Sequence, residues 1–303
     1  MSLLSHPDRG PQSDRPSQRR EEAPVPWSFR ETWLAIFIPL VPWLLLSLLL
    51  SLGAQLQGNR LPGPKAPLSL QQDLEGALAA ALSTLVVEGA FLLVALFFAR
   101  RALRRQSAPR AAEPAQTGAG DEIRSSSTLA AAKEERVSLG SVLQALGLRR
   151  FRPHFLWLVV AFLALLYVVN SLYSALLEGL HLPLQTNDQV ILESSRLEPL
   201  TTVTLLVLAV IVAPLCEEIF FRGFVFPGLR RGLATGWAVL ASALVFGLAH
   251  ADLGSLPVLI VIGLLLALLR WWSGSVYPGL LLHMLNNGIS ATVILLYMLG
   301  RLH

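Results

Sequence analysis

The stretch LTTVTLLVLAVIVAPLCEEIFFRGF, residues 200–224, joins a long apolar run to two glutamates and an arginine. About 20 apolar residues suffice to cross a hydrocarbon core about 30 Å thick as an α-helix. A charged side chain at the centre of such a helix costs about 2.5–3.5 kcal/mol on insertion scales. Glu217, Glu218 and Arg222 therefore need partners, water or a position near the membrane interface.

Similar apolar segments recur along the 303-residue chain, which is 53% hydrophobic and only 15% charged, with a mean hydropathy of +0.57. These segments do not alternate between polar and apolar residues, which excludes a membrane β-barrel. The sequence predicts an all-α fold, a polytopic membrane helical bundle of about seven transmembrane helices. We expect these helices at residues 33–52, 74–99, 154–177, 200–221, 235–250, 256–272 and 276–299.

The basic residues predict how the bundle is oriented. Twenty of the 24 Lys and Arg residues lie in the N-terminal tail, in residues 100–152, in residues 222–231 and at Arg270. By the positive-inside rule, the N-terminus and the segment 100–152 are cytoplasmic, and seven spans place the C-terminus outside. The positive charge thus serves topology, so we expect the lipid bilayer as a partner and no nucleic acid.

The composition divides the chain into four parts. We predict a disordered cytoplasmic tail at residues 1–30, two transmembrane helices at 31–100, a disordered cytoplasmic linker at 101–136 and a compact core at 137–303. The linker is rich in Ala, Ser, Pro and Gly, which disfavours a packed core. The core begins with a short apolar stripe, either an interfacial helix or the frayed start of the next span. The first 26 residues lack the apolar region of a cleavable signal peptide, so the first helix is expected to be an uncleaved anchor.

Helical geometry divides the three charged residues of the opening stretch. Glu218 and Arg222 are four residues apart, so they lie on one face and can form an ion pair. Glu217 is rotated by about 100° and can point elsewhere. The structural alternative is a helix end whose charges simply reach the headgroups.

Two further polar groups lie on later apolar segments. Phe246 and His250 are four residues apart in FGLAH, and His283 and Asn287 are four apart in HMLNN, so each pair shares one helical face. Asn286 is rotated away from His283 and is the less favoured partner. Either group could instead be structural, as a hydrogen-bonded core histidine or as an interhelical hydrogen bond.

Taken together, these side chains can perform hydrolysis. A carboxylate and an imidazole can hold and deprotonate water, while an imidazole and a carboxamide can donate to an oxyanion. One Glu and two His are equally the ligand set of a catalytic zinc site. A cysteine nucleophile is less favoured, because Cys216, the single cysteine, has no base at helical spacing.

The ordered motifs E-E-x-x-x-R, F-x-x-x-H and H-x-x-x-N resemble those of the CAAX protease and bacteriocin-processing family, also called the type II CAAX prenyl endopeptidase family. The resemblance covers roughly residues 150–300. It implies an intramembrane endopeptidase of a bacterial-type plasma membrane, acting on membrane-associated or prenylated-type proteins.

The resemblance also implies residue roles. Glu217 is the general base and His250 positions the water, while His283 and Asn287 stabilise the oxyanion. If zinc is used, the same resemblance makes Glu217, His250 and His283 the ligands; a metal-free glutamate mechanism is the alternative. The residues expected to support the site are Glu218, Arg222 and Phe246.

Two other functions use the same residues. A non-catalytic immunity or scaffold protein would use the polar cluster for packing or partner binding, and an ion or solute carrier would use the intramembrane carboxylates. No inverted repeat is evident, which disfavours the carrier. The enzyme hypothesis has one conflict of depth, because Glu217 is predicted near the cytoplasmic end of its span and His250 near the outer end of the next. The conflict shrinks if the short fifth helix instead starts nearer Leu240 and is displaced, or if the site lies at mid-depth.

Overall fold

The computed structural model describes residues 24–56, 68–107, 137–182, 184, 191–192, 195 and 198–301. Within these residues the regular structure is helical, as predicted. The main helices are α1 (Phe29–Leu56), α2 (Leu70–Ser107), α4 (Leu139–Ala145), α5 (Phe155–Gly179), α10 (Thr235–Ala249), α11 (Leu256–Ser273) and α12 (Tyr277–Met298). A further long helix runs from Pro199 to Leu229 and contains α7 (Pro199–Val207), the π-helix η1 (Leu208–Val212), α8 (Ala213–Glu217), the π-helix η2 (Glu218–Val225) and α9 (Phe226–Leu229).

In the described part of the chain, six helices are long and apolar enough to cross a membrane. They begin at Phe29, Leu70, Phe155, Pro199, Leu256 and Tyr277. The polytopic helical bundle is therefore confirmed. The remaining predicted helix, the fifth in chain order, is α10, which is apolar but has only 15 residues.

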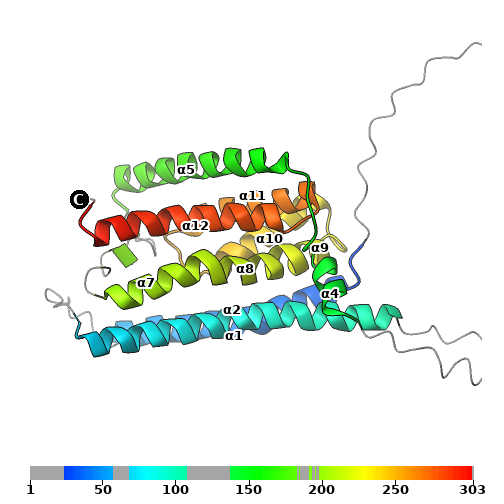
Figure 1. The fold of residues 1–303 in the computed structure, drawn as a ribbon, viewed down its shortest axis with the longest axis horizontal. Helices are drawn as coiled ribbons and strands as arrows, with labels where there is room; N and C mark the ends of the chain where they lie inside the picture. Colours follow the sequence, from blue (N-terminus) through cyan, green and yellow to red (C-terminus); the bar gives the residue numbers. More distant parts are fainter. Residues whose placement is uncertain are drawn as a thin grey trace, which may run out of the picture.

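The helix Pro199–Leu229 lies in the middle of the bundle (Figure 1). On one side it packs against α2, which in turn packs against α1; on the other it packs against α12, which packs against α5. The pair α10 and α11 completes the bundle, and these two helices contact each other along their length. Residues from helices far apart in the sequence can thus meet around the central helix.

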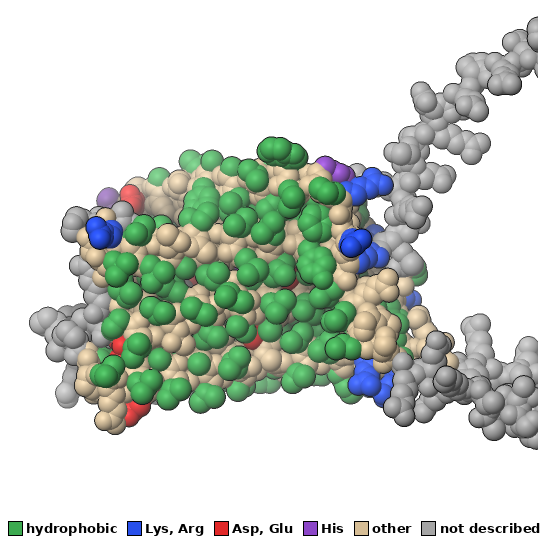
Figure 2. All heavy atoms as spheres, viewed as in Figure 1, with side chains coloured by type: hydrophobic (Ala, Val, Ile, Leu, Met, Phe, Trp, Pro, Cys, Tyr) green, Lys and Arg blue, Asp and Glu red, His purple; other side chains and the backbone are tan. Residues whose placement is uncertain are grey.

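The sides of the bundle are covered by apolar side chains, as expected of a surface in contact with lipid (Figure 2). Most of the visible Lys and Arg side chains gather at the end where α4 and α9 lie. This is the basic end of the bundle, and the positive-inside rule predicts that it faces the cytoplasm. Large exposed apolar residues of the helix sides include Leu34, Phe37, Leu82, Val86, Leu93, Phe97, Val160 and Leu172.

The two π-helices lie on either side of α8, within the central helix Pro199–Leu229. Pro214 has no backbone N–H, so it cannot donate to the preceding turn. In η1 the N–H of Ala213 bonds the carbonyl of Leu208, five residues back. The next bond of this five-residue pattern would join the carbonyl of Ala209 to the N–H of residue 214. Because Pro214 has no N–H, the carbonyl of Ala209 can accept a hydrogen bond from another donor.

The helices α10 and α11 settle the predicted conflict of depth. At 1.5 Å per residue, the 15 residues of α10 span about 22 Å, less than the hydrocarbon thickness of about 30 Å. Leu229 and Thr235 lie at the basic end of the bundle. Counted from that end, Glu217 lies twelve residues into the central helix and His250 lies fifteen residues along α10. Both residues thus lie at a similar, intermediate depth, because α10 turns back into α11 before it reaches the far side.

Packing at the crossing of α10 and α11 is unusually close. A Cβ atom added to Gly263 of α11 would lie 2.9 Å from Cα of Ala243 in α10. A glycine at this position lets the two backbones approach, as small residues do between membrane helices.

The predicted division of the chain is only partly within the described residues. The expected disorder of residues 1–23 and 108–136 falls outside them. It is wrong for residues 24–30 of the predicted tail, where Val25 and Trp27 are buried and Nε1 of Trp27 donates to the carbonyl of Phe224. Likewise, α2 continues through Ser107 into the predicted linker. The short helix α4 begins at the N-cap Ser138, whose hydroxyl accepts a hydrogen bond from the N–H of Ser141. Its role as an interfacial helix stays a prediction.

Candidate active site

Glu217 lies between two histidines that come from other helices. Its Oε1 is 3.8 Å from Nε2 of His250, at the end of α10, and its Oε2 is 3.7 Å from Nε2 of His283, in α12. Glu217 and His283 are buried, while His250 is partly exposed. The structure thus brings these three predicted site residues together inside the bundle.

Each histidine is oriented by a contact at its other ring nitrogen. Nδ1 of His250 lies 2.8 Å from the carbonyl oxygen of Phe246, one turn earlier in α10. Nδ1 of His283 lies 3.2 Å from Oε1 of Glu218. With Nδ1–H donated in this way, a neutral histidine presents an acceptor at Nε2, and only the protonated form donates there.

The predicted ion pair of Glu218 with Arg222 is present, with Oε1 2.9 Å from Nη1, and both side chains are fully buried. Gly279 of α12 makes room for this pair, because a Cβ atom added there would lie 2.9 Å from Oε2 of Glu218. The carboxylate of Glu218 therefore joins the first and third motifs of the sequence, through Arg222 and His283.

Arg222 has apolar as well as polar neighbours. Its guanidinium lies 4.1 Å from the ring centroid of Phe246, a cation–π contact, and Nη2 donates to the carbonyl of Gly263 at 3.4 Å. The ring of Phe246 also packs edge-on against that of His283, with centroids 5.8 Å apart. Phe246 thus contacts both the guanidinium of the ion pair and the ring of His283.

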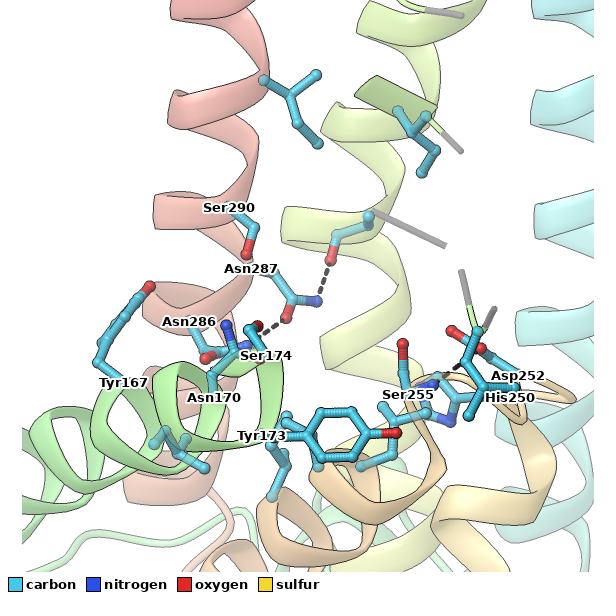
Figure 3. Close-up of a pocket in the computed structure, with 18 of the residues that line it drawn as sticks. Tyr167, Asn170, Tyr173, Ser174, His250, Asp252, Ser255, Asn286, Asn287 and Ser290 are labelled. Atoms are coloured by element: carbon cyan, nitrogen blue, oxygen red, sulfur yellow. Dashed lines mark hydrogen bonds between the residues drawn. The ribbon is translucent and has the colours of Figure 1, made fainter. Parts of the chain in front are cut away.

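Asn287 lies one turn after His283 in α12 and spans the gap to the central helix. Its Nδ2 donates to the carbonyl of Ala209 at 2.9 Å, the carbonyl that Pro214 leaves free (Figure 3). Its Oδ1 accepts a hydrogen bond of 3.2 Å from Nδ2 of Asn286. Asn286, the less favoured residue of the motif, thus orients Asn287, and the second N–H of the Asn287 amide remains available.

The histidines and both asparagines line a cavity of about 850 Å³, a size typical of ligand-binding pockets. The close-up shows α5 supplying one wall, with Asn170 and Ser174 on the side that faces the asparagines of α12. These polar residues of α5 escaped the sequence reasoning. The available signal was their spacing of four residues within an otherwise apolar span.

The turn between α10 and α11 is held by side chains of two other helices. Nε1 of Trp43 in α1 donates to the carbonyl of Ala249 at 2.8 Å, and the hydroxyl of Tyr173 in α5 donates to the carbonyl of Gly254 at 2.6 Å. Within the turn Ala251 has φ of 51°, a left-handed conformation that favours glycine. This conformation directly follows His250 and ends α10.

A further buried carboxylate, Glu88 of α2, is a neighbour of Glu217. Its side chain is 7% exposed, and it interacts electrostatically with both Glu217 and Cys216. Sequence reasoning missed Glu88, although it is the one charged residue within the predicted helix 74–99 after Glu75. That isolation was the available signal.

A zinc site would require the three predicted ligands, Glu217, His250 and His283, to converge on one point. The two histidines approach different oxygens of Glu217, Oε1 and Oε2, instead of converging with one of them. In the described part of the chain, no group of three or more His, Cys, Asp and Glu side chains is arranged to hold a metal ion. The arrangement therefore does not fit a three-ligand centre, and zinc stays a prediction.

Comparison with known proteins gives a family for the segment that carries these residues. The model of the Rce1-like family, type II CAAX prenyl endopeptidase Rce1-like, matches residues 199–289. This segment is similar to the Rce1-like family and is called the Rce1-like segment below. Glu217, His250, His283 and Asn287 all lie within it, whereas α1, α2, α4 and α5 lie outside.

Two bacterial relatives match part of the chain. MroQ of Staphylococcus aureus (strain USA300), named a membrane-embedded CAAX protease, is 34% identical over 84 residues. YdiL of Bacillus subtilis (strain 168), named as a candidate membrane peptidase, is 31% identical over 101 residues. The matches cover 26% and 33% of this chain, and 34% and 40% of the respective relatives. No solved structure matches the chain significantly.

The Rce1-like segment does not build the site alone. One cavity wall comes from α5, and the turn after His250 is held from α1 and α5. Glu88, beside Glu217, comes from α2. The helices outside the family match therefore contribute directly to the surroundings of the candidate active site.

Proposed function

We propose that this protein is an intramembrane endopeptidase that hydrolyses peptide bonds with a water molecule activated by Glu217 and His250. The single observation that carries the proposal is the position of Glu217 Oε1, 3.8 Å from Nε2 of His250, a residue that lines a cavity in the bundle. The match to a family of prenyl endopeptidases and the name of MroQ support it independently.

The distance between these atoms suits a bridging water. It is too long for a direct hydrogen bond, but a water about 2.8 Å from each atom would donate one hydrogen to each. Glu217 takes one proton as general base, and the oxygen attacks the carbonyl carbon of the substrate. The C–N bond then breaks, and the proton passes from Glu217 to the leaving amine.

The oxyanion formed by this attack needs donors on the other side of the carbonyl. The second N–H of the Asn287 amide is one donor, and Nε2–H of protonated His283 is the other. The carboxylates of Glu217 and Glu218 lie on either side of the His283 ring, 3.7 and 3.2 Å from its two nitrogens. Arg222 and Phe246 support this arrangement by fixing Glu218 and the ring of His283.

The substrate proposed is a membrane-associated or prenylated-type protein whose chain enters the cavity in an extended form. A peptide taken out of a membrane helix exposes backbone groups that need partners in the absence of bulk water. Asn170, Ser174 and Asn286 offer such partners, while the remaining lining is largely apolar. The proposed mechanism needs no zinc, and elemental analysis of active protein tests that point.

The proposal predicts the effect of removing an oxyanion donor. We expect Asn287→Ala to lower kcat by about 100- to 1,000-fold with little change in KM, because the lost hydrogen bond forms only in the transition state. The full-length protein in lipid vesicles is assayed with internally quenched apolar peptides, with and without a prenyl group. Mass spectrometry of the products confirms that a peptide bond has been hydrolysed.

Asn286→Ala is the matched control, because it removes the neighbouring amide of the same cavity. We expect its kcat to stay within a factor of about 10, since Asn286 donates a hydrogen bond to Asn287 but is not itself a proposed oxyanion donor. Equal losses in both variants would refute the role of Asn287. Absence of peptide cleavage by the unmodified protein would refute the peptidase and favour a scaffold or immunity protein.

A further inference from the structure

Glu88 lies in the middle of α2, in a membrane-spanning segment, where an ionisable side chain is costly. It is 7% exposed, and no described residue hydrogen-bonds to its Oε2. The proposed reaction uses four residues of the Rce1-like segment and leaves Glu88 without a role. Ionisable side chains inside membrane helices usually pair with another polar group, so a partner for Glu88 is expected nearby.

The pairing of α2 with the central helix places Glu88 at the level of Glu217. Near the start of both helices, Asp73 of α2 accepts hydrogen bonds from the N–H groups of Leu200 and Thr201 at 2.8 and 2.9 Å. Further along, the ring of Phe91 packs against that of Phe220, with centroids 4.8 Å apart. The two helices thus run parallel. The residue numbers of contacting residues differ by an offset of 127 for Asp73 and Leu200, and by 129 for Phe91 and Phe220.

The same offset makes Glu88 and Glu217 neighbours. Glu88 precedes Phe91 by three residues, and Glu217 precedes Phe220 by three, so each glutamate lies one turn before the contacting ring. The electrostatic interaction of Glu88 with Glu217 agrees with this register. The small growth in offset has a physical cause, because the π-helices of the central helix use more residues per turn than α2 does.

Both carboxyl groups present an unused oxygen. Oε1 of Glu217 faces His250, where the water is proposed, whereas its Oε2 lies 3.7 Å from Nε2 of His283, beyond hydrogen-bond distance. No described residue hydrogen-bonds to Oε2 of Glu217 or Oε2 of Glu88. Two buried carboxylates side by side repel each other, and a single proton held between them converts repulsion into a strong hydrogen bond. Such a bond would leave Oε1 of Glu217 free to act as base.

We propose that Glu88 is a positioning residue, which donates a hydrogen bond to Oε2 of Glu217 and holds the opposite oxygen toward His250 and the water. This inference rests on the proposed peptidase function but concerns a helix outside the Rce1-like segment. It assigns α2 a part in the reaction beyond anchoring the chain. Glutamine at position 88 would serve as well, because its amide donates the same hydrogen bond without any proton to lose.

Kinetics of two substitutions test the proposal in the full-length protein, with the quenched peptides and vesicles described above. We expect Glu88→Gln to keep kcat within a factor of about 10, and Glu88→Leu to lower it by about 100-fold with KM unchanged, the cost of a misplaced catalytic group. Ser83→Leu is the matched control, because Ser83 lies on the exposed side of α2 and bonds only within its own helix. Full kcat in Glu88→Leu, or equal losses in Glu88→Gln and Glu88→Leu, would overturn the proposal.

Infrared spectroscopy tests the pair without any turnover, and so separates this proposal from the peptidase function. We expect an absorption band of a protonated carboxyl group that is lost in Glu88→Gln and shifted in Glu217→Gln, because Glu217 accepts its hydrogen bond. A band that Glu217→Gln leaves unshifted, or no such band, would overturn the pairing even if the protein cleaves peptides. If Glu88→Leu does not fold, Glu88→Gln still gives this result.

Discussion

Arg222 shows most clearly how a single residue is accommodated in this bundle. Its side chain is fully buried, paired with Glu218, stacked on Phe246 and bonded to the carbonyl of Gly263. The planar guanidinium makes these contacts at once, which a lysine ammonium could not. The pair therefore fixes the relative positions of the central helix, α10 and α11.

We predict that Arg222→Met destabilises the protein by about 3–5 kcal/mol, because it leaves Glu218 as a buried charge without its main partner. The measurement is reversible unfolding in mixed micelles. Arg150→Met, at an exposed position after α4, is the control and should change stability by no more than about 0.5 kcal/mol. Similar unfolding curves for both variants would contradict the structural role of the ion pair.

At the scale of elements, the turn between α10 and α11 sets the depth of His250. The turn is held from outside by Trp43 and Tyr173, and it contains the left-handed Ala251. A left-handed conformation is strained for a residue with a Cβ atom, and it persists where the surrounding contacts impose it. The strain lies directly beside a proposed catalytic residue.

We predict that Ala251→Gly stabilises the protein by about 0.5–1 kcal/mol, because glycine adopts the left-handed conformation without strain. The same change at Ala241, inside α10, should instead destabilise it by about 1 kcal/mol. Thermal unfolding of the two variants in detergent compares them directly. A loss of stability in Ala251→Gly as large as that in Ala241→Gly would show that position 251 carries no such strain.

The sequence could predict features that depend on local helix geometry, but not those that depend on packing between distant segments. Apolar length located the helices, and spacing of four residues identified the pair Glu218 and Arg222, because both depend on local geometry. The depth of His250 depends on how far α10 reaches before it turns, which apolar length alone does not give. The neighbour of Glu217 in α2 depends on the packing of two segments about 130 residues apart, for which the sequence holds no local signal.

At the scale of the whole molecule, the polar residues converge because the central helix is surrounded. The helix segment that carries Glu217 packs against α2 and α12, and the side chain of Glu217 approaches His250 and His283, which line a cavity that α5 closes. A non-catalytic scaffold could use the same ion pair for packing. It would not need a buried carboxylate whose Oε1 lies 3.8 Å from Nε2 of His250, a residue that lines that cavity.

The rate of peptide cleavage by Glu217→Gln in lipid vesicles tests the central claim most directly, with Glu178→Gln, at the exposed end of α5 on the same cavity, as the control. Glutamine keeps the shape of Glu217 but cannot accept the proton of water. We predict that Glu217→Gln lowers kcat by about 100- to 10,000-fold, the usual contribution of a general base, while Glu178→Gln retains the rate of the unmodified protein. Cleavage by Glu217→Gln at the unmodified rate would contradict the account.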